Sequence, residues 1–254
     1  MPTATTVAAL AVRGASWRIG AVPIVDDVTL DLGPGEFVAL IGPNGAGKTS
    51  LFNLISGLRR PSAGRILLGG HDVTALAPHL RARHGLGRTF QTSAVFGSLT
   101  IAENIALAVQ ARRGGAMRGW RRSTDRDIAA RAEEILQRVR LERHATRIAG
   151  SLAHGEKRKL EIALLLAGEP RVLLLDEPMA GVSLEDVPAL VEVIRGLTAG
   201  SGRSVLMVEH HMDVVLDLAD RVAVLHHGAL LACDTPEAVM ADPFVQQAYL
   251  GEQL

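Results

Sequence analysis

Short apolar runs bounded by turn residues recur along the chain, and they predict strands. The unbroken run at 172–175 is typical of a strand that is buried on both faces of a sheet. Residues 28–32 instead alternate apolar and polar positions, which indicates a strand with one covered face. By these criteria, we predict further strands at 7–12, 37–41, 64–68, 86–90, 204–208, 222–225 and 229–233.

The middle of the chain has a different pattern, because apolar residues recur there at helical spacing and no convincing strand is found. Thr100 and Glu103 are spaced as a capping box, which predicts a helix that begins there and reaches about Arg112. Two more helices are predicted at 124–139 and 156–166. We therefore expect an α/β core with an inserted helical subdomain, the core at 1–91 and 169–254 and the subdomain at 92–168.

Composition narrows the classes of protein that this chain can belong to. Its 254 residues, 48% hydrophobic, suit one α/β domain or a core with a smaller subdomain. A formal net charge of +0 gives no support for nucleic acid as a partner. One cysteine, Cys233, excludes an internal disulfide and fits a reducing compartment. We see no signal peptide and no apolar run approaching the ~18 residues of a membrane span, so we expect a cytosolic protein unless a partner holds it at a membrane.

The stretch between the strand at 37–41 and a helix predicted at 50–56 carries the strongest chemical signal. It contains Gly42, Gly45 and Gly47, which let the backbone turn back on itself and aim its N–H groups inward. The helix that follows adds the positive end of its dipole at the same place. A strand, a glycine loop and a helix in this order predict a phosphate-binding loop.

Two side chains complete the predicted loop. Lys48 can reach the β- and γ-phosphates of a nucleotide, and the Thr49 hydroxyl can ligate Mg²⁺. Lysine is scarce, with three in the whole chain, so a lysine at this place is not expected by chance. The expected nucleotide-binding residues of this loop are Gly42, Pro43, Asn44, Gly45, Ala46, Gly47, Lys48, Thr49 and Ser50.

A second candidate site lies at the end of the apolar strand at 172–175. Asp176 and Glu177 follow it directly, and a charge at the end of such a strand is costly unless it meets a partner. Given a phosphate-binding loop earlier in the chain, we expect Asp176 to meet Mg²⁺, usually through water. Glu177 is then placed to polarise a water for attack on the γ-phosphate. Taken alone, the two residues could equally form an ordinary acidic turn.

Four more segments occur in a recognisable order. Gln91 ends the run R-T-F-Q, L-A-H-G-E-K begins at Leu152 and opens a helix, A-G-V-S at 180–183 follows the two acids, and His210 follows the strand at 204–208. Together with the phosphate-binding loop, they make the sequence resemble the ATP-binding subunits of ABC transporters over nearly the whole chain. The fold that this implies is α/β: a P-loop NTPase of the ABC ATPase type. It has a mixed core sheet flanked by helices, an antiparallel N-terminal β part and an inserted helical subdomain.

The resemblance also implies a role for each segment. Gln91 is the Q-loop glutamine, assigned to catalysis and to the metal. His210 is the switch histidine, assigned to catalysis together with Glu177. Residues 180–183 are the D-loop. The implied cofactors are ATP and Mg²⁺, with Thr49, Gln91 and Asp176 as the metal residues. The implied signature motif contacts the ATP of a partner subunit through Ala153, His154, Gly155 and Glu156.

Within the family, the chain looks like the importers of branched-chain amino acids. The segments that carry this likeness are R-T-F-Q-T-S-A-V-F-G-S-L-T-I-A-E-N at 88–104, G-E-K-R-K-L-E-I-A at 155–163, V-E-H-H-M at 208–212 and A-Y-L-G at 248–251. Those systems have two different ATP-binding subunits, and this Q-loop and the arginine-rich insert resemble the first of them. Similar importers carry urea, short amides or aromatic acids.

Three positions depart from the family pattern. Ala153 stands where the signature motif has a serine, which removes a hydroxyl donor to the partner's γ-phosphate. Ile19 aligns with the aromatic residue that stacks on adenine, and Trp17 either substitutes for it or simply packs against the protein. Ser183 ends the D-loop where aspartate or asparagine is common.

The implied partners are a second ATP-binding subunit, two integral membrane permease subunits and a periplasmic or lipoprotein solute-binding protein, with no nucleic acid. The implied location is the cytoplasmic face of a bacterial cell membrane. Two other functions stay open on the sequence: a soluble ABC ATPase acting on DNA or ribosomes, and a regulatory module that binds ATP but hydrolyses little.

Two surface features also have alternative interpretations. The arginines at 112, 113, 118, 121 and 122 form either a solvated loop or a contact with lipid headgroups or a membrane partner. Phe96 either anchors a short helix of a membrane subunit or packs inside the helical subdomain.

Overall fold

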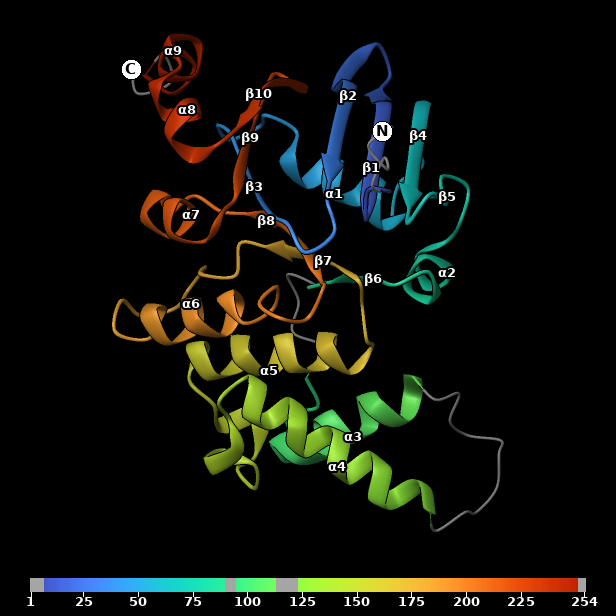
Figure 1. Cartoon of the computed structure of the whole chain (residues 1–254), viewed down its shortest axis with the longest axis vertical. Coiled ribbons are helices and arrows are strands. Elements are labelled where there is room, and N and C mark those ends of the chain that lie inside the picture. Colours follow the sequence, from blue (N-terminus) through green and yellow to red (C-terminus); the bar gives the residue numbers. More distant parts are fainter. Residues whose placement is uncertain (1–6, 90–94, 113–122, 251–254) are drawn as a thin grey trace, which may run out of the picture. The chain divides into compact units, whose positions relative to one another are not determined.

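The computed structural model describes residues 7–89, 95–112 and 123–250. The chain divides into two compact units (Figure 1). The first unit consists of Met1–Arg88, Arg171–Pro178 and Leu197–Leu254, and the second consists of Thr89–Pro170 and Met179–Gly196. No helix in the described part of the chain is both long and apolar enough to cross a membrane.

An antiparallel four-stranded sheet forms one side of the first unit. Its strands, in spatial order, are β2 (Val22–Leu32), β1 (Leu10–Ile19), β4 (Ala63–Leu68) and β5 (His71–Asp72). The hairpin of β1 and β2 is longer than the strands predicted at 7–12 and 28–32. The register between β1 and β2 shifts three times after Val12, and these irregularities break the alternation on which a sequence prediction depends.

A six-stranded mixed sheet forms the other side of this unit (Figure 1). Its neighbouring strands are parallel, except that β10 pairs antiparallel with β9. The predicted fold, a mixed sheet with an antiparallel N-terminal part, is therefore confirmed. In spatial order the strands are β10 (Ala229–Asp234), β9 (Arg221–His226), β3 (Phe37–Ile41), β8 (Ser204–Val208), β7 (Val172–Asp176) and β6 (Leu86–Arg88).

Both faces of the mixed sheet are covered. Along β3, Val38 and Leu40 belong to the core cluster shared with helix α1 (Lys48–Ser56) and the antiparallel sheet. Ala39 and Ile41 point the other way, since successive strand residues face opposite sides. They pack with residues of helices α7 (Met212–Leu218), α8 (Pro236–Ala241) and α9 (Pro243–Leu250). This two-sided burial explains why β3 is an unbroken apolar run.

A buried arginine holds the carboxyl end of α1. Arg81, on helix α2 (Pro78–Arg83), is 1% exposed. It donates hydrogen bonds to the carbonyl oxygens of Leu54 at 2.6 Å and Ile55 at 2.7 Å. Burial lowers the pKa of Arg81 to about 10, yet the guanidinium stays charged at neutral pH. It thus satisfies carbonyl groups that the helix end leaves without helical partners.

The second unit is helical. Its helices are α3 (Ile101–Arg112), α4 (Ser123–Arg138), α5 (His154–Ala167) and α6 (Val187–Arg195), with 3-10 turns at Glu142–His144 and Ala149–Ser151. The predicted capping box is confirmed, because the Thr100 N–H donates to Glu103 Oε2 at 2.8 Å and the Glu103 N–H donates to Thr100 Oγ1 at 3.2 Å.

Besides shifts of two or three residues at its two boundaries, the helical unit differs from the expected one by an additional segment. Residues 169–254 were all expected in the core, but Met179–Gly196 groups with the helical unit. The reason is that α6 packs against α5, and the carboxylate-bearing Asp186 lies next to Gly155 at the start of α5. An amphipathic helix with this packing cannot be distinguished by sequence pattern from a helix that covers the sheet.

Candidate functional site

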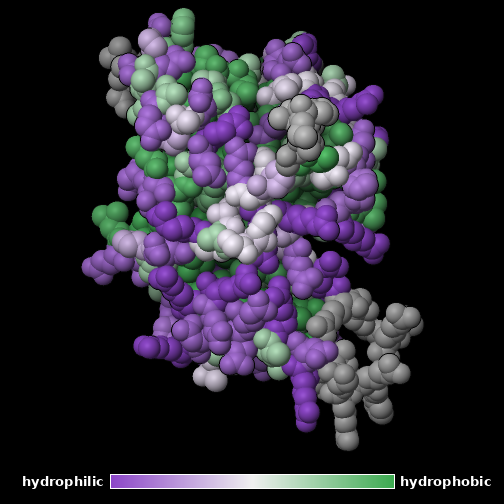
Figure 2. All heavy atoms as spheres, viewed as in Figure 1, coloured by the Kyte–Doolittle hydropathy of each residue, from purple (hydrophilic) through white to green (hydrophobic). Residues whose placement is uncertain are grey.

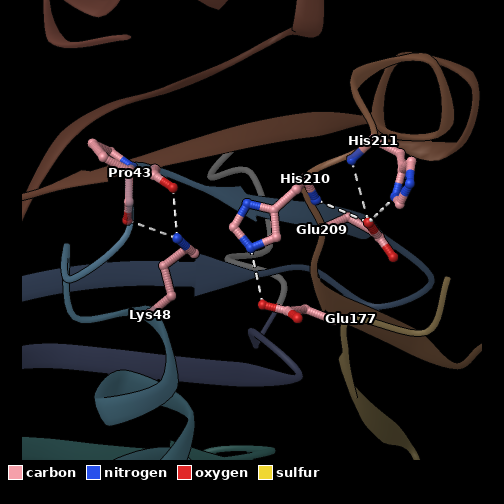
Figure 3. Close-up of polar contacts among 7 residues, drawn as sticks. Pro43, Lys48, Glu177, Glu209, His210 and His211 are labelled. Carbon is pink, nitrogen blue, oxygen red and sulfur yellow. Dashed lines mark hydrogen bonds and ion pairs between the residues drawn. The ribbon is translucent and has the colours of Figure 1, made fainter. Parts of the chain in front are cut away.

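Three loops of the first unit leave the mixed sheet at the same edge. The strands β3, β8 and β7 are parallel neighbours, so their carboxyl ends coincide. In open α/β sheets, ligands bind outside this edge. The three loops carry the predicted phosphate-binding residues after β3, Glu177 after β7 and His210 after β8. Residues that the sequence separates by more than 100 positions thus belong to one edge (Figure 3).

The phosphate-binding loop is held by its own backbone. Lys48 Nζ donates to the carbonyl oxygens of Gly42 at 2.5 Å and Pro43 at 2.8 Å, so the ammonium lies across the loop (Figure 3). Gly42 and Gly47 have φ values of 150° and 102°. A Cβ added to them would lie 2.1 Å from the Leu225 carbonyl oxygen and 2.5 Å from the Ile24 carbonyl oxygen, respectively. Only glycine fits at either position, as a phosphate cradle requires.

Asp176 ends β7 as a buried carboxylate. Its residue exposure is 6%, and Arg88 Nη2 lies 3.0 Å from Asp176 Oδ2. Thr49, one residue into α1, is exposed. No cluster of three His, Cys, Asp or Glu side chains suited to a metal is found among the described residues. One carboxylate, one hydroxyl and a phosphate-binding loop nevertheless fit Mg²⁺, which takes few protein ligands and completes its shell with water and nucleotide phosphates.

Glu177 and His210 form a pair. His210 Nε2 lies 2.9 Å from Glu177 Oε1, and both side chains are partly exposed (Figure 3). Glu177 has a φ of 47°, which is unusual for a residue with a side chain. Its N–H donates to the Val208 carbonyl oxygen at 2.9 Å, which anchors this backbone to the end of β8. The geometry presents an acid and an imidazole together at the ligand-binding edge.

Glu209 is a buried carboxylate that we did not predict. It is 2% exposed, and its Oε2 accepts hydrogen bonds from the His210 N–H at 2.8 Å and the His211 N–H at 3.3 Å. His211 Nδ1 is 2.9 Å from the same oxygen (Figure 3). These contacts hold the backbone of the loop that carries His210. The signal was available, because Glu209 follows an apolar strand just as Asp176 does.

The segment 152–156 lies in the second unit, at the start of α5. Leu152 is buried, whereas Ala153 and His154 are exposed. Ala153 is the N-cap residue and has no side-chain acceptor, but its N–H donates to Glu156 Oε2 at 3.2 Å. Glu156 Oε1 in turn lies 2.7 Å from His144 Nδ1 and 2.8 Å from Arg147 Nη1. The beginning of this helix is therefore stabilised by a glutamate tied to the preceding turns.

Several of the predicted positions have informative surroundings. Ile19 is 59% exposed, whereas Trp17 packs against the core of the first unit with the Arg59 guanidinium 5.6 Å from its ring centroid. Packing is thus the interpretation of Trp17 that the structure favours. Phe96 is 60% exposed, which rules out the alternative that its side chain is buried in the helical unit. Gln91 and the arginines at 113, 118, 121 and 122 lie outside the described residues.

Comparison with known families decides the membership of the chain. Residues 25–180 match the family described as ABC transporter, and residues 229–254 match a family described as branched-chain amino acid ATP-binding cassette transporter. The chain belongs to the ABC transporter family. As a member, it is an ATPase of the kind that powers transport. The matched region includes the phosphate-binding loop, Asp176 and Glu177.

Individual relatives agree with this membership. This chain is 39% identical over 250 residues to the high-affinity branched-chain amino acid transport ATP-binding protein LivG of Escherichia coli K12. The alignment covers 96% of this chain and 98% of LivG. The chain is 38% identical to BraF of Pseudomonas aeruginosa at the same coverage. The lipopolysaccharide export system ATP-binding protein LptB of Haemophilus influenzae is 35% identical over 230 residues, covering 91% and 92% of the two chains.

Solved structures give the same fold. The ADP conformation of MJ1267, an ATP-binding cassette of an ABC transporter, superposes with a TM-score of 0.84 at 27% identity and covers 97% of this chain and 100% of its own. A dimeric post-hydrolysis state of the cassette MJ0796 bound to ADP and phosphate gives a TM-score of 0.74 at 25% identity, covering 89% and 98%. The fold of this ABC ATPase is thus that of cassettes crystallised with nucleotide.

Proposed function

We propose that this chain is the motor subunit of an importer for branched-chain amino acids or a related small polar solute, such as urea, an amide or an aromatic acid. The names of LivG and BraF and the match of the C-terminal segment 229–254 support this solute class. The proposed partners are a second ATP-binding subunit, two membrane permease subunits and a solute-binding protein that acts through them. The proposed place of work is the cytoplasmic face of the membrane.

The observation that carries the proposed mechanism is the Glu177–His210 pair at the edge where the phosphate-binding loop lies. Backbone N–H groups of residues 42–49 and Lys48 bind the phosphates of ATP, and the dipole of α1 adds to the attraction. Bound Mg²⁺ would supply charge neutralisation on the phosphates, held by Thr49 and, through water, by Asp176, with Gln91 as a further predicted ligand.

Glu177 accepts a proton from the attacking water, and His210 orients the glutamate. In a head-to-tail dimer, the start of α5 in one subunit closes on the ATP of the other. Ala153, His154, Gly155 and Glu156 present backbone N–H groups and the helix dipole there, without a serine hydroxyl. The adenine meets Ile19, an aliphatic surface in place of an aromatic ring.

The test uses Glu177→Gln with Lys48→Ala as its counterpart. Glu177→Gln should keep ATP affinity and lower turnover by on the order of 10²–10⁴-fold, the usual contribution of a general base. Lys48→Ala should lose affinity for ATP, measured by calorimetry.

A transport assay tests the importer. Uptake of radiolabelled leucine by cells that lack this chain should be restored by the wild-type protein and by neither variant. If Glu177→Gln hydrolysed ATP at the wild-type rate, the proposed mechanism would be wrong. If the deletion strain took up leucine and the related solutes as fast as the wild-type strain, the proposed import function would be wrong.

A further inference from the structure

Arg88 stands out among the residues to which the proposed mechanism gives no part. It is the last residue of β6, and its side chain is 9% exposed. Its Nη2 lies 3.0 Å from Asp176 Oδ2, and the Asp176 side chain is 2% exposed. The pair is therefore buried, which is costly unless the geometry is good and the remaining donors are used.

A second nitrogen of the guanidinium, Nη1, contacts helix α1, whereas the buried Nε has no hydrogen-bond partner among the described residues. Arg88 Nη1 donates to Asn53 Oδ1 at 2.7 Å and to Ser56 Oγ at 2.9 Å. The guanidinium carbon also lies 5.7 Å from the centroid of the Phe52 ring, within the range of a cation–π contact. One planar cation thus joins the helix that follows the phosphate-binding loop to the carboxylate at the end of β7.

The two anchors on α1 share a face with Thr49. Positions 49, 53 and 56 are spaced i, i+4 and i+7, which puts them on one side of a helix. Arg88 Nη1 therefore contacts the face of α1 that carries Thr49, the predicted hydroxyl ligand of Mg²⁺. Arg88 Nη2 contacts Asp176, the carboxylate predicted to contact the same ion. Partners that orient metal ligands in this way typically contribute about 10–100-fold to metal affinity.

We propose that Arg88 is a positioning residue that sets the separation and orientation of Thr49 and Asp176, and so controls how strongly Mg²⁺ contributes to nucleotide binding. The inference rests on the proposed metal site. A lysine cannot replace Arg88, because a single ammonium cannot reach the carboxylate and both helix anchors in the fixed fork that a guanidinium provides.

The experiment separates the metal from the nucleotide. ADP affinity is measured by calorimetry for the wild-type protein and Arg88→Lys, once with Mg²⁺ and once with EDTA. We expect Arg88→Lys to bind ADP about tenfold more weakly with Mg²⁺ and to match the wild-type protein in EDTA. Titration of Mn²⁺ into the ADP complex, followed by electron paramagnetic resonance, should show the same weakening of metal affinity directly.

A matched control comes from the other end of α1. Arg81 is also buried and donates to carbonyl oxygens of Leu54 and Ile55. Arg81→Lys should lower the melting temperature yet leave the ratio of the two ADP affinities at the wild-type value. If Arg88→Lys proves too unstable to purify, Asn53→Ala decides, because it removes one helix anchor and leaves the Arg88–Asp176 pair in place. Asn53→Ala should weaken ADP binding only when Mg²⁺ is present, and by a smaller factor than Arg88→Lys.

Distinct outcomes overturn distinct claims. Equal weakening of ADP affinity with Mg²⁺ and with EDTA would make Arg88 a structural residue and refute the inference. A wild-type Mg²⁺ effect that persists unchanged in Arg88→Lys and Asn53→Ala would also refute it while leaving the metal site intact. Identical ADP affinity of the wild-type protein with Mg²⁺ and EDTA would remove the metal site itself, and the inference with it.

Discussion

Two helices of this protein begin at predicted phosphate contacts, and they are built in different ways. The start of α1 is made by backbone geometry, with Gly47 as the N-cap residue at a φ of 102° and no side-chain cap. The start of α5 is made by side chains, with Glu156 accepting from Ala153 and tied to His144 and Arg147. The phosphate-binding loop leaves no room for a side chain at Gly42 and Gly47, whereas the start of α5 is stabilised by side chains of the preceding turns.

The largest expected effect tests the steric part of this comparison. Gly47→Ala should destabilise the protein and abolish nucleotide binding, because its Cβ would lie 2.5 Å from the Ile24 carbonyl oxygen. Backbone strain alone contributes about 1–3 kcal/mol. Gly45→Ala is the control, since φ there is 81° but no heavy atom lies within 4 Å of the added Cβ. Similar melting temperatures for the two variants would show that the close approach at Gly47 is unimportant.

The second prediction removes Glu156, whose side chain links the start of α5 to the preceding turns. Glu156→Ala should lower the unfolding free energy by about 1–2 kcal/mol, the range of a lost cap with charge-assisted hydrogen bonds. Glu156→Gln should recover part of the loss, because its amide oxygen can still accept from the Ala153 N–H. Denaturant titration measures the change, with the exposed Glu133 of α4 changed to alanine as control. Equal unfolding free energies of Glu156→Ala and Glu133→Ala would show that the contacts of Glu156 do not stabilise the protein.

The third prediction sharpens the comparison by completing the cap. Ala153→Ser adds the hydroxyl that the N-cap of α5 lacks, which should raise stability by about 0.5–1 kcal/mol. Across a head-to-tail dimer, the same hydroxyl should add a bond to the γ-phosphate and tighten ATP-driven association. Sedimentation with ATP reports this second effect. Unchanged association would mean that the backbone and dipole of α5 already supply what the partner's phosphate needs.

The smallest effect concerns a third helix start, that of α3. Hydrogen bonds from Thr100 lower the pKa of Glu103 from its usual 4.5. A carboxyl group with a lowered folded pKa adds stability above its unfolded pKa, and this is lost as pH falls through the folded value. The wild-type protein should therefore melt slightly higher than Glu103→Gln at pH 7, with the gap closing below about pH 4.5. A gap that is constant with pH would exclude a charge-dependent cap.

The sequence predicted what depends on local rules. The glycine loop, the strand at 37–41 and the capping box at Thr100 each follow from neighbouring residues, and the structure contains all three. The long hairpin of β1 and β2 escaped prediction because bulges interrupt its alternation. The placement of α6 escaped because an amphipathic pattern shows that a face is buried but not which element covers it.

The residues of the candidate site likewise fall into two groups, those that short sequence patterns predict and those that only tertiary contacts reveal. Lys48, Asp176 and Glu177 were predicted because a glycine loop and an acid-ended strand are visible in short windows of sequence. Arg88 and Glu209 were not, since their importance lies in the partners that meet them. Arg88 meets Asn53 and Asp176 from 35 and 88 positions away, respectively. By itself, the sequence pattern determined the glycine loop and the acid-ended strand, and it predicts which residues do chemistry. The tertiary structure decided which side chains position those residues, because parallel strands bring distant loops to one edge.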